Sequence, residues 1–218
     1  MSRKGRRPTF SDIADYMQEM RRVGHYADKV IVQKASGKVY DRNQFVIACL
    51  VSAREVRYID DSALKEFETH IKRLRRIKCD EGYLLHGRVA ILMNELHKHH
   101  NKHGEARLLD PFGSIRTDLD IDTPYDEFEE PVDYMDELES AFKEEFGTEA
   151  KSYLLIFSHY IPCTLDGHQC SEVIGEYANQ TSHKVYVGYE DVYKKTDKDD
   201  AVHAMKSNGV GIVFPHQL

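Results

Sequence analysis

The sequence lacks any long apolar run: hydrophobic residues make up 41 % of its 218 residues, and the mean hydropathy is −0.58. A membrane-spanning helix needs about 20 consecutive apolar residues, so we expect no span and no membrane partner. The first residues, MSRKGRRPTF, are charged and are not followed by the apolar core of a secretory signal. We therefore expect an intracellular protein, cytoplasmic or nuclear.

Cysteine is also scarce, with four in the chain. Without a secretory signal, so few cysteines argue against a disulfide framework and for reduced thiols. Reduced cysteines serve either in core packing or as metal ligands. Cys49 lies in an apolar run and is expected in the core, and Cys79 follows a cluster of basic residues and is expected to be an exposed thiol. The pair Cys163 and Cys170 is left as the candidates for chemistry.

Charge is unevenly distributed along the chain. From Thr117 to Glu149 there are fourteen acidic residues and one basic residue, Lys143, so the net charge of this stretch is −13. The net charge of the whole chain is −7, so the remaining residues together carry +6. The basic residues outside it form two clusters: Arg3, Lys4, Arg6, Arg7, then Lys72, Arg73, Arg75, Arg76. They are either solvated surface or a surface that binds the phosphates of single-stranded DNA or RNA.

The hydrophobic spacing predicts alternating strands and helices, hence an α/β fold with a mixed sheet covered by helices. Strands are expected over 44–52, 153–157, 185–189 and 210–214, with 55–59 as a hairpin partner. Helices are expected from Ser11 onward and over 61–78, 85–96, 135–146, 170–177 and 198–206. The chain then forms one domain with a helical arm (1–36), an extra helix (61–78) and an acidic insertion (about 104–149).

Three residues suggest a metal centre: His86 at the head of the predicted 85–96 helix, and Cys163 and Cys170 between a strand and a helix. Zinc held by one histidine and two thiolates keeps a fourth position open for water, as catalysis requires. His168 lies between the cysteines and is either a base or a fourth ligand that would close the site. The histidines at 97, 99, 100 and 103 are expected at an exposed helix terminus.

The order of elements around these residues resembles the zinc-dependent cytidine deaminase superfamily, and its AID/APOBEC-like branch in particular. The matching segments are LLHGRVAILMNEL with His86, SHYIPC…C from Ser158 to Cys170, KVYVGYEDVYK, and DDAVHAMKSNGVGIVF at the end. The resemblance implies a three-layer helix–sheet–helix fold with a mixed five-stranded sheet. It also implies a Zn²⁺ cofactor and hydrolytic removal of an amine from cytosine or adenine.

The sequence departs from that pattern at one catalytic position. The family signature is His-x-Glu, whereas the residue two places after His86 is Arg88. Glutamate transfers protons during deamination, and arginine cannot accept one at neutral pH. Glu172 is a candidate substitute base, and Arg88→Glu is predicted to raise deamination of cytidine if the pocket is otherwise intact.

The resemblance also places His159, Tyr160 and Tyr189 near the substrate base. Three hypotheses remain open. In the first, the chain is an active zinc deaminase of nucleobases, either free or in single-stranded nucleic acid. In the second, it is a catalytically silent zinc protein of the same fold that binds nucleic acid or a protein partner. In the third, it is a different α/β protein whose cysteine pair is incidental.

Overall fold

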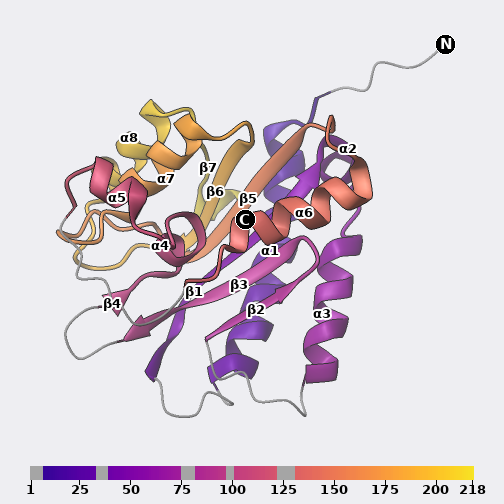
Figure 1. Ribbon diagram of the computed structural model, residues 1–218, viewed down its shortest axis with the longest axis horizontal. Helices are drawn as coiled ribbons and strands as arrows, with labels where there is room; N and C mark the ends of the chain where they lie inside the picture. The colour runs from indigo at the N-terminus through magenta and orange to yellow at the C-terminus, as the bar shows by residue number, and fades with distance from the viewer. Residues whose placement is uncertain (1–6, 33–38, 75–81, 97–100, 122–130) are drawn as a thin grey trace.

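The computed structural model describes residues 7–32, 39–74, 82–96, 101–121 and 131–218. Its sheet has the order β2-β3-β1-β5-β6-β7, with the short β4 paired to β3 (Figure 1). The strands are β1 (Val39–Ser52), β2 (Tyr83–His86), β3 (Val89–Leu96), β4 (Asn101–Lys102), β5 (Ser152–Tyr160), β6 (Lys184–Asp191) and β7 (Gly211–Val213). Strand β1 is antiparallel to both β3 and β5, and β5, β6 and β7 are parallel. The sheet is mixed, as predicted, but it has six strands in a row plus β4 instead of five.

Helices cover both faces of the sheet (Figure 1), which confirms the α/β class. One face packs against α1 (Phe10–Val32) and α3 (Ser62–Leu74), and the other packs against α4 (Gly104–Leu109), α5 (Ser114–Asp118), α6 (Tyr134–Phe146), α7 (Cys170–Gln180) and α8 (Lys198–Ser207). The short α2 (Ala53–Tyr58) follows β1, and a 3₁₀ turn (Pro215–Gln217) follows β7. Two separate hydrophobic cores therefore lie on the two sides of the sheet.

Helix α1 presents an apolar stripe to the sheet, and its members are all buried: Ile13, Tyr16, Met17, Met20. Its N-terminal cap is Thr9, and the helix begins at Phe10, one residue before the start at Ser11 that the sequence predicted. The Asp12 backbone N–H donates to the Thr9 hydroxyl oxygen at 3.3 Å, and the Thr9 N–H donates to an Asp12 carboxylate oxygen at 2.6 Å. This reciprocal pair satisfies two backbone donors at the start of the helix.

Two segments adopt a different structure from the one predicted. Residues 85–96, expected as a helix, belong to the β2–β3 hairpin, whose loop begins with Gly87 at φ 54°. Strand β3 lies inside the sheet and is buried on both faces, so most of its residues are apolar. Such a run lacks the hydrophobic periodicity by which a strand can be distinguished from a helix in the sequence. Residues 55–58 of the segment 55–59, expected as a strand, lie in α2, and Ile59 is its C-terminal cap. Ser52 and Glu55 form a capping box at the start of this helix.

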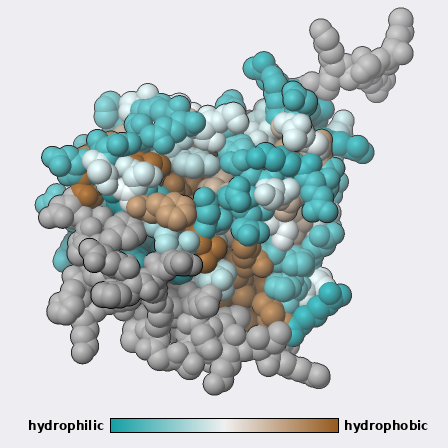
Figure 2. All heavy atoms as spheres, in the orientation of Figure 1, coloured by the Kyte–Doolittle hydropathy of each residue, from teal (hydrophilic) through white to brown (hydrophobic). Residues whose placement is uncertain are grey.

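The acidic segment supplies helices of the second face. Helix α6 spans the predicted 135–146 range and buries Leu138 and Phe142, while its outer side carries Asp136, Glu137 and Glu144. Figure 2 shows hydrophilic side chains over this part of the surface. Among the described residues, no helix combines the length and apolar character that crossing a membrane requires.

Candidate metal centre and pocket

The two cysteines lie at the ends of the loop that joins β5 to α7. Cys163 follows Pro162 after the strand, and Cys170 is the first residue of α7. The loop turns at Gly167, which has a φ of 75°. Both the backbone N–H and the hydroxyl of Ser171 donate to the Cys163 carbonyl at 3.1 Å, which fixes the two ends of the loop together. Both cysteines are buried and reduced.

His103, not His86, completes this group. The Nδ1 atom of His103 lies 3.4 Å from the sulfurs of both Cys163 and Cys170, and these three residues form a set whose ligand atoms converge. Tetrahedral zinc with its usual bond lengths would place nitrogen and sulfur about 3.6 Å apart. The donors therefore fit a zinc ion after a shift of a few tenths of an ångström. The predicted His86 ligand is wrong.

His86 lies at the end of β2, on the loop of the β2–β3 hairpin, and is exposed. Its ring stacks on that of His70 from α3, with centroids 4.3 Å apart. The assignment failed because it assumed that residues 85–96 form a helix with His86 at its head. In the hairpin, the polypeptide must run the whole length of β3 before it reaches the sheet edge where the cysteines lie.

The close contact between the two thiols and His103 shifts the pKa values of Cys163 and Cys170 in opposite directions. Hydrogen bonds from the Cys170 thiol and from His103 stabilise the Cys163 thiolate and hold its pKa below the ordinary value of a thiol, although burial opposes the shift. The pKa of Cys170 is raised, because its proton is held by the Cys163 sulfur and its surroundings are buried. A metal cation would replace these protons as the partner of the sulfurs.

A glutamate lies two residues after the histidine, so the His-x-Glu pattern occurs at His103-Gly104-Glu105. Glu105 is buried, and its Oε1 accepts a hydrogen bond of 2.8 Å from the Ser158 hydroxyl on β5. Burial raises the pKa of this carboxyl. Sequence reasoning missed the motif because the surrounding HKHHNKHGEA is polar and was interpreted as an exposed helix terminus. The consecutive His-x-Glu letters were the signal that could have found it.

Packing fixes the place of this motif. The Gly104 N–H donates to Asn94 Oδ1 at 2.8 Å, and Asn94 Nδ2 donates to Gln44 at 2.7 Å. A Cβ atom on Gly104 would lie 3.0 Å from the Leu92 carbonyl oxygen and 3.0 Å from a methyl of Val46. Glycine at this position therefore lets α4 approach β1 and β3 closely enough to bring its first residues to the cysteines.

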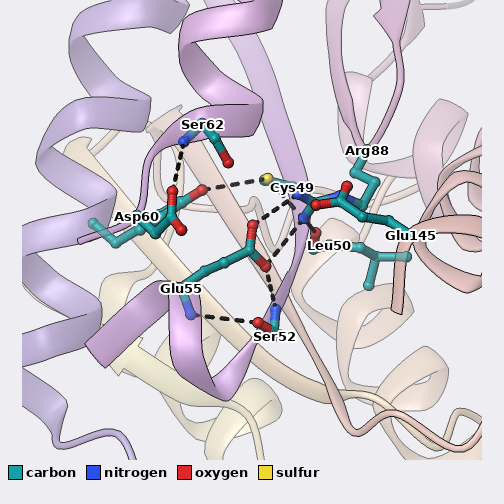
Figure 3. Close-up of polar contacts among 9 residues, drawn as sticks. Cys49, Leu50, Ser52, Glu55, Asp60, Ser62, Arg88 and Glu145 are labelled. Atoms are coloured by element: carbon teal, nitrogen blue, oxygen red, sulfur yellow. Dashed lines mark hydrogen bonds and ion pairs between the residues drawn. The ribbon is translucent and has the colours of Figure 1, made fainter. Parts of the chain in front are cut away.

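Arg88 is remote from this group and forms a buried ion pair (Figure 3). Its guanidinium donates to both carboxylate oxygens of Glu55, at 2.7 and 3.2 Å, and to the Leu50 carbonyl at 2.7 Å. It also donates to Glu145 on α6 at 2.8 Å and lies over the Phe146 ring. The interpretation of Arg88 as the residue at the catalytic glutamate position is wrong, since this side chain ties α2 and α6 to the sheet.

A pocket of about 240 Å³ lies beside the cysteine pair. Its lining includes the site residues His103, Glu105, Ser158 and Cys163, and, around them, Gln44, Phe45, Asn94, Tyr160, Ile161, Leu165, His168, Tyr193 and Lys195. Tyr160 and Tyr193 pack edge to face with centroids 5.7 Å apart. The pocket thus combines aromatic surfaces, one lysine and the buried glutamate in front of the cysteines.

The substrate residues predicted from the resemblance fall in three places. Tyr160 lines the pocket. Tyr189 does not line the pocket. It is buried in the hydrophobic core between the sheet and helices α4 to α8, and within the described chain its hydroxyl has no hydrogen-bond partner. His159 points to the opposite side of the sheet from Ser158, where it contacts Glu190 at 3.2 Å. Tyr189 and His159 are therefore not pocket residues.

Two other candidates lie at the margin of the site. His168 lines the pocket and stacks on the His103 ring with centroids 4.1 Å apart, but it is not one of the three converging ligands. Burial and the neighbouring His103 lower the pKa of His168. Glu172 lies in the first turn of α7, half-buried, and does not line the pocket, so its predicted role as a substitute base has no support from its position.

The predicted nucleic-acid surface is only partly described. Arg3, Lys4, Arg6, Arg75 and Arg76 lie outside the described residues, and Arg7 is exposed ahead of α1. Lys72 and Arg73 are exposed on α3, on the face of the sheet opposite α4. Lys72 pairs with Glu68 at 3.0 Å. Of the predicted basic residues that the structure describes, none lines the pocket, whose lysine is Lys195.

No family model matches this chain, and no curated protein matches its sequence. What the chain does is therefore inferred from its own atoms. The features that bear on function are one histidine and two cysteines with metal-ligand spacing, a buried glutamate two residues from the histidine, and an aromatic pocket in front of them.

Proposed function

We propose that this chain is a zinc-dependent deaminase that hydrolyses the exocyclic amine of a cytosine- or adenine-type base. The observation that carries the proposal is the position of Glu105, buried against Ser158 in the same pocket as the His103 and Cys163 side chains. The group has the three protein ligands and the separate carboxylate of a zinc deaminase. Its donor spacing of 3.4 Å fits the ion.

The metal ligands, Glu105 and Ser158 have separate roles in the proposed reaction. His103, Cys163 and Cys170 would hold the zinc ion, which would supply a nucleophilic water at neutral pH by lowering its pKa to about 7. Glu105 accepts the proton of the attacking water and delivers it to the amine nitrogen that leaves as ammonia. The Ser158 hydroxyl engages Oε1 of Glu105 and orients the carboxylate, so that the other oxygen, Oε2, carries the proton.

The pocket supports a planar base as the substrate. Tyr160, Tyr193 and Phe45 offer aromatic surfaces on which a base can stack. Lys195 at the same pocket offers a cation to a phosphate or a base carbonyl.

The catalytically silent alternative rested on an arginine at the position of the proton-transferring glutamate. That premise no longer holds, because Arg88 is engaged with Glu55 elsewhere in the fold and Glu105 lies beside the candidate ligands. The proposal therefore favours an active enzyme. Single-stranded nucleic acid and free nucleoside both present the same base, and the assay distinguishes them.

The test measures ammonia release by zinc-loaded protein from cytidine, adenosine and single-stranded DNA and RNA oligonucleotides. We expect turnover of at least one of them, and we expect Glu105→Gln to keep its zinc while losing about 10²–10⁴-fold in rate. Glu172→Gln is the matched control, since it removes a charged glutamate outside the pocket, and it should retain full activity. Absence of turnover by the zinc-loaded wild type on all four substrates, or full activity of Glu105→Gln, would refute the proposal.

A further inference from the structure

A second set of metal-ligand side chains lies on the other side of the sheet from the cysteine pair. His25 from α1, His159 from β5 and Glu190 from β6 place one nitrogen or oxygen atom each within 4.8 Å of one another. His25 Nε2 lies 2.7 Å and His159 Nδ1 lies 3.2 Å from the same carboxylate oxygen, Oε2 of Glu190. Three elements distant in sequence therefore direct their donor atoms at one point.

The position of this cluster makes it independent of the first centre. Consecutive residues of a strand point to opposite faces, and Ser158, which contacts Glu105, precedes His159. His25 belongs to α1, which covers the face opposite α4. The two sets share no residue, although Phe45 contacts the His25 ring edge to face at 5.1 Å and also lines the pocket.

The donor atoms define the class of ligand. Two imidazole nitrogens and one carboxylate oxygen suit zinc and the neighbouring divalent transition metals, whereas calcium and magnesium prefer oxygen alone. With zinc bond lengths and a tetrahedral angle, the donor atoms would lie about 3.3 Å apart. The His159 distance of 3.2 Å already matches this value, and the His25 distance of 2.7 Å requires an opening of about half an ångström.

The surroundings favour a cation that enters from solvent. The side chains of His25, Glu190 and His159 are 30 %, 25 % and 14 % exposed, so an ion can reach them and water can complete its coordination. Arg21 forms an ion pair with the other oxygen of Glu190, Oε1. A contact of this kind orients a ligating carboxylate, and here it leaves Oε2 directed toward both imidazoles.

We propose that His25, His159 and Glu190 form a second binding site for a divalent transition-metal ion of the zinc class, which fastens α1 to the ends of β5 and β6. The proposal does not depend on the deaminase function or on metal binding at the cysteines. Its occupant has a structural role, since the site lies outside the pocket and across the sheet from Glu105.

The test counts metal ions bound by the full chain after loading with Zn²⁺ and removal of excess ion. We expect two equivalents for wild type, one for His25→Gln and for Glu190→Gln, and one for Cys163→Ser. His70→Gln is the matched control, because it removes a histidine that stacks on another histidine outside both groups, and it should retain two. Far-UV circular dichroism establishes that each variant is folded.

Cobalt distinguishes the two sites within the wild-type protein, which removes any dependence on how the variants fold. Co²⁺ at the cysteines gives strong sulfur-to-metal charge-transfer bands, whereas Co²⁺ on two histidines and a carboxylate gives only weak d–d bands. We expect one equivalent of each kind. Failure of Cys163→Ser to bind any ion, an unchanged count in His25→Gln, or a wild-type cobalt spectrum that saturates with the thiolate bands alone would overturn the second site. A wild-type cobalt spectrum that shows the weak d–d bands without the thiolate bands would instead count against the proposed deaminase and leave the second site standing.

Discussion

The ion pair between Arg88 and Glu55 provides the sharpest test of the fold. Both side chains are buried, with exposed fractions of 3 % and 4 %, and two hydrogen bonds join them. Arg88→Met keeps a long apolar side chain but leaves the Glu55 carboxylate buried without its cation. Removing one partner of a buried pair costs about 3–5 kcal/mol, because the remaining charge keeps its desolvation penalty. The second partner, Glu145, is half exposed and adds little.

Glu55 has a second role, which the loss of Arg88 would also disturb. Its Oε2 accepts the Ser52 N–H at 2.7 Å in the capping box of α2, so a displaced carboxylate also weakens the start of that helix. We therefore expect Arg88→Met to lower the free energy of unfolding by about 3–5 kcal/mol. Adding Glu55→Gln, which removes the unpaired charge, should recover at least about 1 kcal/mol of that loss.

Urea unfolding at pH 7, followed by far-UV circular dichroism, measures these differences, and urea is preferable to guanidinium because it does not screen charge. Arg73→Met is the matched control, since this arginine is exposed on α3 and its loss should stay within about 0.5 kcal/mol. A loss below about 1 kcal/mol for Arg88→Met would refute the reasoning. Arg88→Glu would place a third carboxylate beside Glu55 and Glu145, so we expect it to unfold the protein and not to create activity.

Further predictions concern the metal ligands and one charged cluster. His103→Gln should abolish zinc binding at the cysteines while His86→Gln leaves it unchanged, as measured by the number of ions lost when Cys163 is alkylated. Zinc removal by a chelator should lower the melting temperature by more than about 5 °C, because the ion joins two loops. Gly104→Ala should destabilise the fold by about 1–3 kcal/mol in urea and weaken zinc binding, since its Cβ would meet backbone at 3.0 Å. Burial alone would raise the pKa of Glu190, but its cationic partners lower it to about 2 from the ordinary 4.5. The stability that metal-free wild type gains over Glu190→Gln should therefore be present above pH 4.5 and disappear as the pH falls toward 2.

The sequence predicted the elements whose hydrophobic pattern has a clear period or clear ends. The stripe on α1, the acidic helix α6 and the strand–helix–strand order from β5 to β7 are all present, with boundaries that shift by a few residues. The place of Cys163 and Cys170 between a strand and a helix was also predicted, because Pro162 marks a strand end and the helix begins at Cys170. These signals are local, so tertiary contacts were not needed to interpret them.

The failures share one physical cause, which is that tertiary packing decided the local structure. Strand β3 has no period because both its faces are buried. Helix α4 has only six residues, too few for a hydrophobic periodicity to be recognised. So short a helix is stabilised by its contacts with β1, β3 and α7. Ser52 and Glu55 have the spacing of a capping box, but a strand was predicted over 55–59 from the alternation of those residues alone.

The strand order explains why His103 and not His86 reaches the cysteines. Strand β1 lies between β3 and β5 and is antiparallel to both, so β3 and β5 run in the same direction and their carboxyl ends meet at one edge of the sheet. His103 comes after β3 and Cys163 comes after β5, whereas His86 precedes β3 and lies at the opposite edge. Once residues 83–96 are recognised as a hairpin, this topology alone excludes His86 and selects a histidine C-terminal to β3. One wrong secondary-structure assignment was therefore enough to select a histidine at the opposite end of the strands from the cysteines.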